Sequence, residues 1–496
     1  MEPIVLIHGY SAESKQTTAQ AIASIYGTLP RALRDAYGRD AVVEIDLSRY
    51  VSLEDGVTLD DISRALDRAL PDGFPQLLEG PFHVIAHSTG ALVIRNWIRR
   101  FSLKPSPIRN VVYLAGANFG SGWAHIAKGQ LAKWARRVFQ QGAERGLLVL
   151  DSLELGSDWT LDLHLAFLGS GATMARDFKV QEFVIVGTQA DVEWYALPIR
   201  YAKEDGSDGV VRVSGSNLNF HYLRFGPTSE ALSLDWRAAA GELDRHLRRS
   251  GARRPFYEIK EASRPGLAGR PEIPLAIPYG CAHSGEKMGV VTGSEPREQV
   301  LRLLRQALEA GPGQGSGRVA AFQKETEETY RRALAGQAPS WWRKWISEPR
   351  AQYDPHAQII FRIRDQDRRP AEHFDIFFDS AQGRRDSSLP MRELFEDKHV
   401  NSLSPNIITF YLRTDAFSAE EGKWLPRIPK VNGCFLEVSA VEPQTGEILY
   451  LPMRFEFTAA QLATWIQGHR TTLVDVDLLR LPSPEIFRLV RYSTAG

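Results

Sequence analysis

The sequence has few of the features that mark a secreted, membrane-spanning or nucleic-acid-binding chain. Its 496 residues include only two cysteines, Cys281 and Cys434, which lie too far apart for a metal-binding motif. Lysine and arginine total 60, and aspartate and glutamate also total 60, so no net charge attracts nucleic acid. No apolar run approaches the roughly 20 residues that cross a bilayer. These absences predict reduced thiols and no nucleic-acid partner.

The first residues, MEPIVLIHGY, also lack the basic segment and the small-residue cleavage site of a secretory signal. We expect them to form a strand inside the fold. The sequence therefore predicts a cytoplasmic location, or export without a cleavable signal peptide.

The chain is longer than a single hydrophobic core usually supports, so two or three domains are expected. From residue 3 to about 310, short apolar runs alternate with amphipathic helical patterns. This alternation predicts an α/β unit with a parallel sheet covered on both faces. The expected strands are residues 3–7, 41–47, 82–86, 110–116 and 183–187.

The remaining chain predicts an insertion and a second unit. The alternation breaks over 118–177, which is long enough to indicate a helical lid. The stretch GPGQGSG indicates a linker, followed by a helix-prone segment, and together they occupy 311–350. Strand patterns separated by turn residues then predict a β-rich accessory domain, an antiparallel β-sandwich, over 351–496. The catalytic domain is expected to span 1–310.

The segment FHVIAHSTG, residues 82–90, has the pattern of a serine nucleophile placed between a strand and a helix. Ser88 follows an apolar run, and Gly90 begins a helical pattern. Ala86 stands where the first glycine of G-x-S-x-G is expected, and its single methyl group is small enough to be tolerated there. The alternative is that Ser88 only caps the helix. The choice between the two depends on partners elsewhere in the chain.

An oxyanion site is the first such partner. The strand VLIHGY, residues 5–10, ends in a flexible turn at Gly9. We expect the N–H groups of Tyr10 and Thr89 to point at one oxygen and to stabilise a negative charge on it. His8 is expected to be structural.

A general base is expected downstream of the serine. His283 lies where a short strand runs into a glycine-rich loop, which would position an imidazole while leaving it some freedom. The other downstream histidines of this unit lie in a charged helix, in a strand or in the expected lid, and are poorer candidates. They are His246, His221, His125 and His164.

The acid that orients this base is expected after the strand at 183–187. Asp208 opens an Asp-Gly turn that would fix its backbone, and we favour it. Asp191 lies nearer the strand end and remains the serious competitor. Asp205 has the surroundings of a solvated loop residue.

Together, the motifs VLIHGY, AHSTG, LAGANFGSGWA, SDGVVRVSGSNL and AHSG resemble those of bacterial lipases and esterases with the α/β-hydrolase fold. The resemblance covers about residues 3–310. It implies Ser88 as the nucleophile, Asp208 as the acid and His283 as the base, with the N–H groups of Tyr10 and Thr89 at the oxyanion.

The resemblance does not imply a metal ion or another cofactor. Some lipases of this family hold calcium through an aspartate two residues past the catalytic histidine, and Gly285 occupies that position here. We also expect Trp123 and His87 to contact substrate. The alternative for Trp123 is that it packs the insertion onto the body of the domain.

The expected activity is hydrolysis of lipid acyl esters, of lipase or phospholipase A type, through a Ser-His-Asp triad and an acyl-serine. A non-lipid esterase and an acyltransferase are the alternatives. A non-catalytic binding protein with this fold would lack a triad member, and none is missing. The sequence leaves open whether the C-terminal region contacts a membrane surface, a delivery partner or a second subunit.

Overall fold

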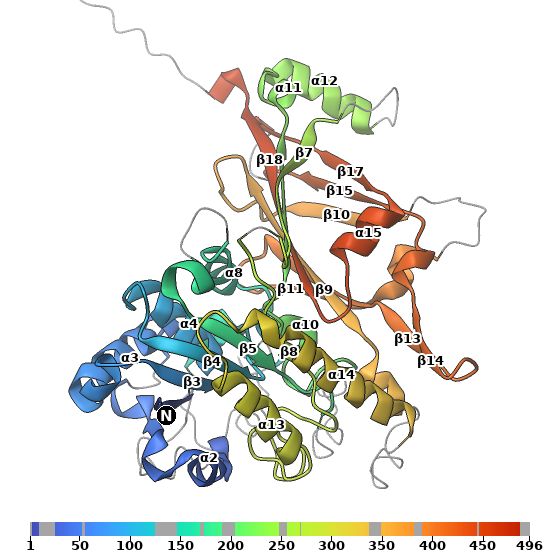
Figure 1. Cartoon of the computed structure of the whole chain (residues 1–496). Helices are drawn as coiled ribbons and strands as arrows, with labels where there is room; N and C mark the ends of the chain where they lie inside the picture. Colours follow the sequence, from blue (N-terminus) through green and yellow to red (C-terminus); the bar gives the residue numbers. More distant parts are fainter. Residues whose placement is uncertain are drawn as a thin grey trace, which may run out of the picture.

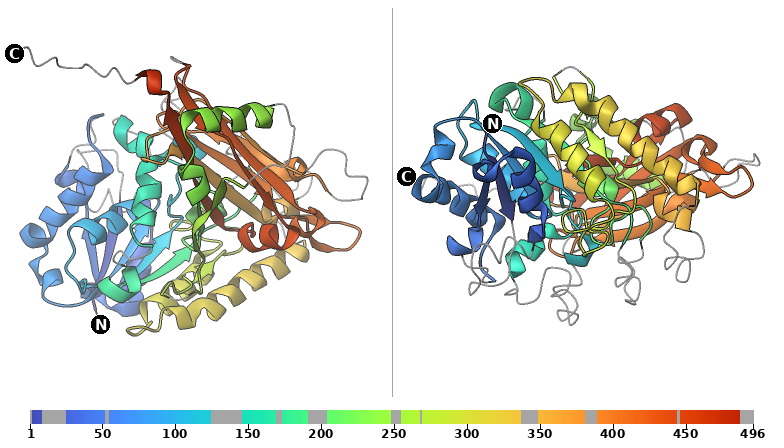
Figure 2. Two further views of the ribbon diagram at one scale, coloured as in Figure 1. Left: turned by 90° about the horizontal axis from the view of Figure 1, so that it is seen from above. Right: turned by 60° about the horizontal axis from the view of Figure 1, so that its bottom comes forward.

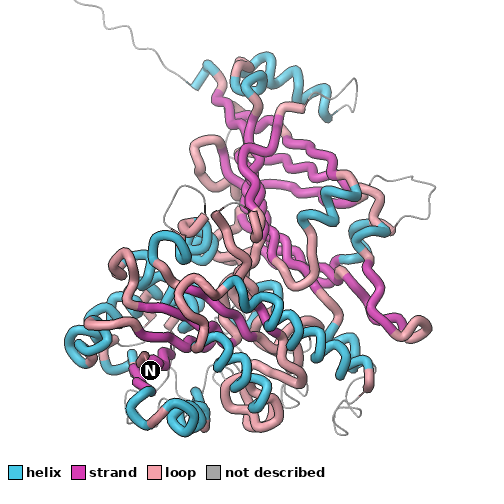
Figure 3. Tube along the Cα trace, viewed as in Figure 1, coloured by secondary structure: helices cyan, strands magenta, loops and turns pink. Residues whose placement is uncertain are grey.

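The computed structural model describes residues 2–8, 25–51, 55–124, 146–168, 173–190, 204–247, 255–267, 269–336, 349–380, 389–443 and 446–486. Its strands gather into two groups, one surrounded by helices and one composed mostly of strands (Figures 1 and 3). This arrangement combines the α/β-hydrolase fold with a β-rich unit, as expected. In the part of the chain that the structure describes, no helix has the length and apolar character needed to span a membrane.

The first sheet is parallel throughout, with strand order β2-β1-β3-β4-β5-β8. Strands β3 and β5 are buried on both faces over almost their whole length, as expected for a sheet covered by helices. The strands are β1 (Ile4–His8), β2 (Val42–Ile45), β3 (Phe82–His87), β4 (Ile108–Leu114), β5 (Gln181–Ile185) and β8 (Leu275–Ala276).

Alternate strand residues point to opposite faces of this sheet, and both faces carry apolar side chains, so helices cover both. On one side Val5 and Ile7 share a core with Ile62 of α3 (Leu59–Gly73) and Val93 of α4 (Gly90–Arg100). On the other side, the core is closed by α2 (Leu29–Tyr37), α13 (Arg297–Leu308) and α14 (Val319–Leu334). The active-site candidates follow strand ends between these two helical layers.

The second sheet is mixed, with strand order β11-β12-β9-β18-β6-β7 and β16 also pairing with β18. Strands β9, β18 and β6 run parallel to one another, and the other pairs are antiparallel. The strands are β6 (His221–Pro227), β7 (Tyr257–Ser263), β9 (His356–Asp365), β11 (Phe395–Val400), β12 (Ile407–Arg413), β16 (Ile448–Leu451) and β18 (Thr471–Pro482).

This sheet differs from the sequence prediction in two ways. A purely antiparallel sheet was expected, and strands from before residue 310 were expected to belong to the first unit. Instead, β6 and β7 complete the second sheet, where His221 pairs with Thr472. The local pattern of β6 marks it as a strand but does not encode which distant strand lies beside it. The domain boundaries at 310 and 351 remain a prediction, and the second sheet does not follow them.

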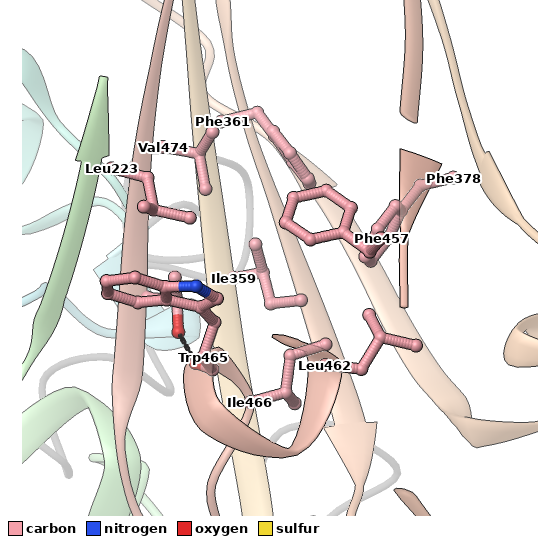
Figure 4. A pocket seen from close by; sticks show the side chains of 10 residues that line it. Leu223, Ile359, Phe361, Phe378, Phe457, Leu462, Trp465, Ile466 and Val474 are labelled. Atoms are coloured by element: carbon pink, nitrogen blue, oxygen red, sulfur yellow. Dashed lines mark hydrogen bonds between the residues drawn. The ribbon is translucent and has the colours of Figure 1, made fainter. Parts of the chain in front are cut away.

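A smaller sheet of β10 (Phe374–Asp379), β15 (Cys434–Ala440) and β17 (Met453–Phe457) packs face to face with the second sheet. The seven-residue helix α15 (Ala459–Trp465) closes one end of the gap (Figure 4). A cavity of about 20 Å³ remains, room for one water-sized molecule. Its lining is apolar except for Thr472: Leu223, Ile359, Phe361, Phe378, Phe457, Leu462, Trp465, Ile466 and Val474. The sandwich interior is therefore nearly filled.

The glycine-rich stretch 311–317 forms a short turn between α13 and α14. Both helices lie along the first sheet, and α14 extends beside the second unit (Figure 2). The Gly315 N–H donates to Gln181 at 2.5 Å, which fixes this turn on the start of β5. Farther along α14, the ring centroid of Tyr330 lies 5.0 Å from that of Trp424 in β14 (Lys423–Pro426). The predicted linker thus forms a turn between two helices, the second of which packs against β14.

Candidate active site

Ser88 lies at a sharp bend between β3 and α4. Its φ of 53° is in the left-handed region, which is strained for any residue but glycine. Two backbone contacts hold this conformation: the Ser88 N–H donates to Leu114 at 3.0 Å, and the Ser88 carbonyl accepts from Ala117 at 3.3 Å. The bend therefore thrusts the side chain out beyond the strand end.

The alanine at the first elbow position is accommodated without a gap or displacement of the strand. Ala86 is fully buried, and it stays in register with Ile7 on one side and Tyr113 on the other. The close approach occurs one strand over, where a Cβ on Gly116 would lie 2.9 Å from the Ala91 Cβ of α4. A small residue is thus required at 116 as well.

His283 is the residue that meets the serine. Its Nε2 lies 3.2 Å from the Ser88 Oγ, and its Nδ1 lies 2.9 Å from Oδ2 of Asp208. With the Nδ1–H donating to the carboxylate, Nε2 is left to accept the hydroxyl hydrogen. The imidazole is almost completely buried, and because both of its nitrogens have protein partners, neither needs a hydrogen bond to water.

Asp208 is held by backbone groups of its own turn. Its Oδ1 accepts from the N–H of Val210 at 2.9 Å and from the N–H of Val211 at 2.7 Å. Its backbone carbonyl also accepts from the His283 N–H at 3.1 Å. The carboxylate is buried, and these fixed donors together with the imidazole compensate for the loss of water. We call residues 204–212 the acid loop.

Two of the predicted residues cannot be located. Tyr10 lies within 9–24 and the competing acid Asp191 within 191–203, and both segments lie outside the described residues. Thr89 is buried at the N-cap of α4. Its N–H is among the first N–H groups of the helix, which have no partner within the helix itself.

His87 was expected to contact substrate, which remains a prediction, and the structure places it against the base. Its Nε2–H donates to the His283 carbonyl at 3.3 Å, and the two ring centroids are 4.8 Å apart. Burial, and after it the neighbouring His283, lowers the pKa of His87 well below its usual value, so the ring is neutral. Its contacts support the backbone and the ring of His283.

Trp123 was also expected to contact substrate, which remains a prediction, and the structure shows its contacts within the protein. Its side chain is fully buried in the first core, and its indole N–H donates to the Gly209 carbonyl at 2.6 Å. Ser121 acts in the same way on the next carbonyl, that of Val210, at 2.6 Å. Both side chains hold the acid loop, a role that the sequence did not signal because the contacts join distant segments.

The described helices of the predicted lid are attached to the second sheet. Glu154, which follows α7 (Leu147–Leu153), accepts from the Ser402 N–H at 2.8 Å and lies 3.0 Å from the His399 Nε2. Arg362 of β9 contacts Asp162 of α8 (Asp158–Leu165) at 2.7 Å. Residues 125–145, including Trp134 and Phe139, lie outside the described residues, so a lid over the site remains a prediction.

The described surroundings offer neither a second nucleophile nor a metal site. Burial, and then the charge of Asp208, raises the pKa of the Cys281 thiol well above its usual value, which suppresses the reactive thiolate. Among the described residues, no group of three or more His, Cys, Asp or Glu side chains is arranged to hold a metal ion. The chemistry that this part of the molecule can supply is proton transfer between Ser88 and His283.

Comparison with known proteins places the fold. No protein-family model matches the chain. No curated protein matches its sequence. Two solved structures of phospholipase PlaB from Legionella pneumophila, one in complex with thio-NAD, match with TM-scores of 0.73 and 0.72. Each match is 22% identical and covers 100% of this chain and 97% of that chain.

A lipase structure also matches, over less than half of this chain. The mature lipase BlEst2 from Bacillus licheniformis aligns with a TM-score of 0.31 and 14% identity, over 44% of this chain and 79% of that chain. The likeness to PlaB extends over the whole chain and shows a shared fold that includes both the α/β unit and the β-rich unit.

Proposed function

We propose that this chain is a serine carboxylic-ester hydrolase that cleaves acyl esters of lipids. The observation that carries the proposal is the hydrogen-bonded series from Ser88 to His283 to Asp208, built at a strained strand-to-helix bend. A serine that merely capped α4 would need neither a buried imidazole nor a buried carboxylate behind it. We assign these three residues as nucleophile, base and acid.

In the first half-reaction, the Ser88 oxygen attacks the ester carbonyl carbon as His283 Nε2 takes the hydroxyl proton. The carbonyl oxygen becomes an oxyanion, for which we assign the N–H groups of Thr89 and Tyr10 as donors. Asp208 holds the imidazole with Nδ1–H toward the carboxylate and stabilises its cation. His283 then gives the proton to the leaving alcohol, and the acyl group remains on Ser88.

In the second half-reaction, a water molecule takes the place of the Ser88 hydroxyl as the nucleophile. His283 takes a proton from the water molecule as the water oxygen attacks the acyl carbon. The resulting oxyanion then collapses. The bond to the Ser88 oxygen breaks, and that oxygen recovers its proton from His283. The products are the carboxylic acid and the free enzyme.

The lipid substrate class is supported by two observations. The solved structure that matches over the whole length is called a phospholipase, and its architecture includes the second unit as well as the first. The insertion 118–177 is also rich in large apolar side chains, which suit an acyl chain better than a small soluble ester. A phospholipase A activity is the specific form we propose, and a lipase activity is the alternative that the test distinguishes.

The test compares wild type with Ser88→Ala on phosphatidylcholine vesicles, triacylglycerol emulsions and short- and long-chain p-nitrophenyl esters. We expect wild type to release fatty acid and lysophospholipid, and Ser88→Ala to lose about 10⁴- to 10⁶-fold in kcat/KM. A fluorophosphonate should label wild type on the peptide that contains Ser88. Preferential release of fatty acid from triacylglycerol would indicate a lipase.

Ser233→Ala is the matched control, because this exposed serine in the turn after α11 (Ser229–Leu232) lies on the second unit. It should retain wild-type rates and labelling. Folded wild-type protein that neither cleaves any ester nor reacts with the fluorophosphonate would contradict the proposed function.

A further inference from the structure

The acid loop is closed on itself by an ion pair between its two ends. Arg212 donates from Nε and Nη2 to the two carboxylate oxygens of Glu204, at 2.9 and 2.7 Å. The Arg212 side chain is almost completely buried, so this two-point contact is shielded from solvent. The ion pair fixes the width of the loop that contains Asp208.

The same arginine attaches the loop to the second sheet. Its Nη2 also donates to Oδ2 of Asp397 in β11, at 2.6 Å, and its guanidinium carbon lies 4.1 Å from the ring centroid of Tyr411 in β12. Asp397 and Tyr411 are paired across the two strands. The pairing shifts between Phe395 and Asp397, an irregularity of the kind that turns a side chain toward a neighbouring segment.

Backbone contacts give the loop further attachments. The Tyr411 hydroxyl donates to the Asp205 carbonyl at 2.8 Å, and the Gly206 N–H donates to the Gln352 carbonyl at 3.1 Å. A Cβ on Gly206 would lie 2.7 Å from both the Tyr411 hydroxyl and the His356 Nδ1. The loop and the sheet are thus in direct contact, with no room for a side chain between them.

These attachments lie within a few residues of the groups that orient the imidazole. Val210 and Val211, whose N–H groups bind the Asp208 carboxylate, directly precede Arg212. A reacting group must be held within about 0.5 Å of its productive position, and a displacement of about 1 Å can cost a factor of 100 in rate. A movement of Arg212 would therefore change the contact between Asp208 and His283.

From these contacts we infer that Arg212 and Asp397 are positioning residues, through which the second sheet holds Asp208 against His283. The β-rich unit then contributes to catalysis by positioning the triad acid. The inference rests on the proposed function, because it concerns the rate of the same triad.

Asp397→Asn tests the inference, because it keeps the shape of the side chain and removes the charge that binds Arg212. Asp379→Asn is the matched control: Asp379 is also buried in the β-rich unit and pairs with Arg392 at 3.2 Å, away from the acid loop. For Asp397→Asn we expect kcat to fall on the order of 10- to 100-fold with KM within twofold of wild type, because the triad is displaced. Fluorophosphonate labelling should slow by the same factor.

Tyr411→Phe provides a second measurement in case Asp397→Asn does not fold, since it leaves no charge unpaired. It removes the hydroxyl that binds the Asp205 carbonyl and keeps the ring beside Arg212. We expect kcat and the labelling rate to fall about 3- to 10-fold.

The inference is overturned if the folded variants of Asp397 and Tyr411 match Asp379→Asn in kcat and labelling rate, even where their melting temperatures fall. If Asp397→Asn is insoluble, the Tyr411→Phe rates decide alone. Wild-type protein that is inactive and unlabelled would instead overturn the proposed function, and the inference with it. An active wild type with unaffected variants would overturn the inference only.

Discussion

Single residues at this site adopt backbone conformations that the rest of the sheet does not require. Ser88 and Ala115, which directly follow β3 and β4, have φ values of 53° and 48°. Strain of this kind costs on the order of 1–3 kcal/mol per residue and persists only where the surroundings enforce it. Here the N–H of Ala115 donates to Ile185 at 2.8 Å, so a neighbouring strand holds the bend.

Gly206 is a second residue at which backbone conformation matters, and we predict that Gly206→Ala will reduce both stability and activity. Its φ is +69°, and the new Cβ would be too close to Tyr411 and His356. We expect a loss of about 2–4 kcal/mol in the free energy of unfolding, from the backbone strain and the clash together. Urea denaturation and ester hydrolysis by the folded variant measure the two effects.

Gly422→Ala is the control for this change. Gly422 has a φ of +64°, and no atom lies within 4 Å of the position that a Cβ would occupy, so the substitution introduces the strain without the clash. It should cost about 1 kcal/mol and leave ester hydrolysis unchanged. Equal losses of stability and activity in both variants would show that close contact at Gly206 is unimportant.

At the scale of elements, a buried arginine of the second sheet also forms ion pairs with α8. Arg362 of β9 forms a two-point contact with Asp475 of β18, at 2.9 and 3.0 Å, and also reaches Asp158 and Asp162 of α8. The arginine is almost completely buried, while the two α8 carboxylates are largely exposed. Leu161 of α8 also packs against Ile360 of β9 and Leu473 of β18, so apolar contacts and the arginine together attach the helix to the sheet.

We predict that Arg362→Met will destabilise the protein, because it leaves the buried Asp475 with fewer partners. Removing one member of a buried ion pair typically costs about 3–5 kcal/mol, and Arg364, which lies 2.8 Å from Asp475, should reduce that to about 2–3 kcal/mol. The free energy of unfolding in urea measures the loss. Hydrogen exchange should also become faster in α8.

Arg392→Met is the corresponding control on an exposed arginine that pairs with Asp379. An ion pair with one partner in solvent contributes little, so this variant should lose less than about 1 kcal/mol. A loss in Arg362→Met no greater than in Arg392→Met would mean that the buried contacts do not stabilise the attachment of α8.

Local signals in the sequence found the elements on which the site is built. The apolar run before Ser88, the helical pattern from Gly90 and the Asp-Gly turn at Asp208 each lie within a few residues of the feature they predict. The contacts between segments could not be found in this way. Arg212 and Asp397 are both ordinary charged residues in the sequence, and only the folded chain brings them together.

The same limit explains the difference in sheet membership. β6 was recognisable as a strand from its composition, but its partner β18 follows far along the chain. Parallel pairing of this kind leaves no local sequence pattern that identifies the partner strand.

At the scale of the whole molecule, the two units share the chain and are not arranged one after the other. After β5 of the first sheet, the chain forms β6 and β7 of the second sheet. It then returns to the first sheet at β8. The chain therefore crosses between the units several times. Cutting it at the predicted linker would separate strands that pair with each other.

We predict that a fragment of residues 1–350 will be insoluble or only partly folded. Without β18, the strand β6 would expose an unpaired edge and the buried side chains of Leu223 and Phe225. Size-exclusion chromatography and circular dichroism of the fragment test this. Co-expression with residues 351–496 should recover soluble complex if the missing partner strands are the cause.

A soluble, monomeric fragment with a cooperative unfolding transition would contradict this prediction. It would show that the first unit folds without the strands that complete the second sheet, and that the shared chain imposes no dependence between them.

The central place of β18 also has a consequence during translation. At about 5–20 residues per second, roughly 10–50 s separate the emergence of β6 from that of β18. Throughout this interval the nascent chain carries a finished strand whose inner partner has not yet been made. In the ribosome-bound intermediate, the unpaired edge of β6 is therefore a surface that a chaperone could cover.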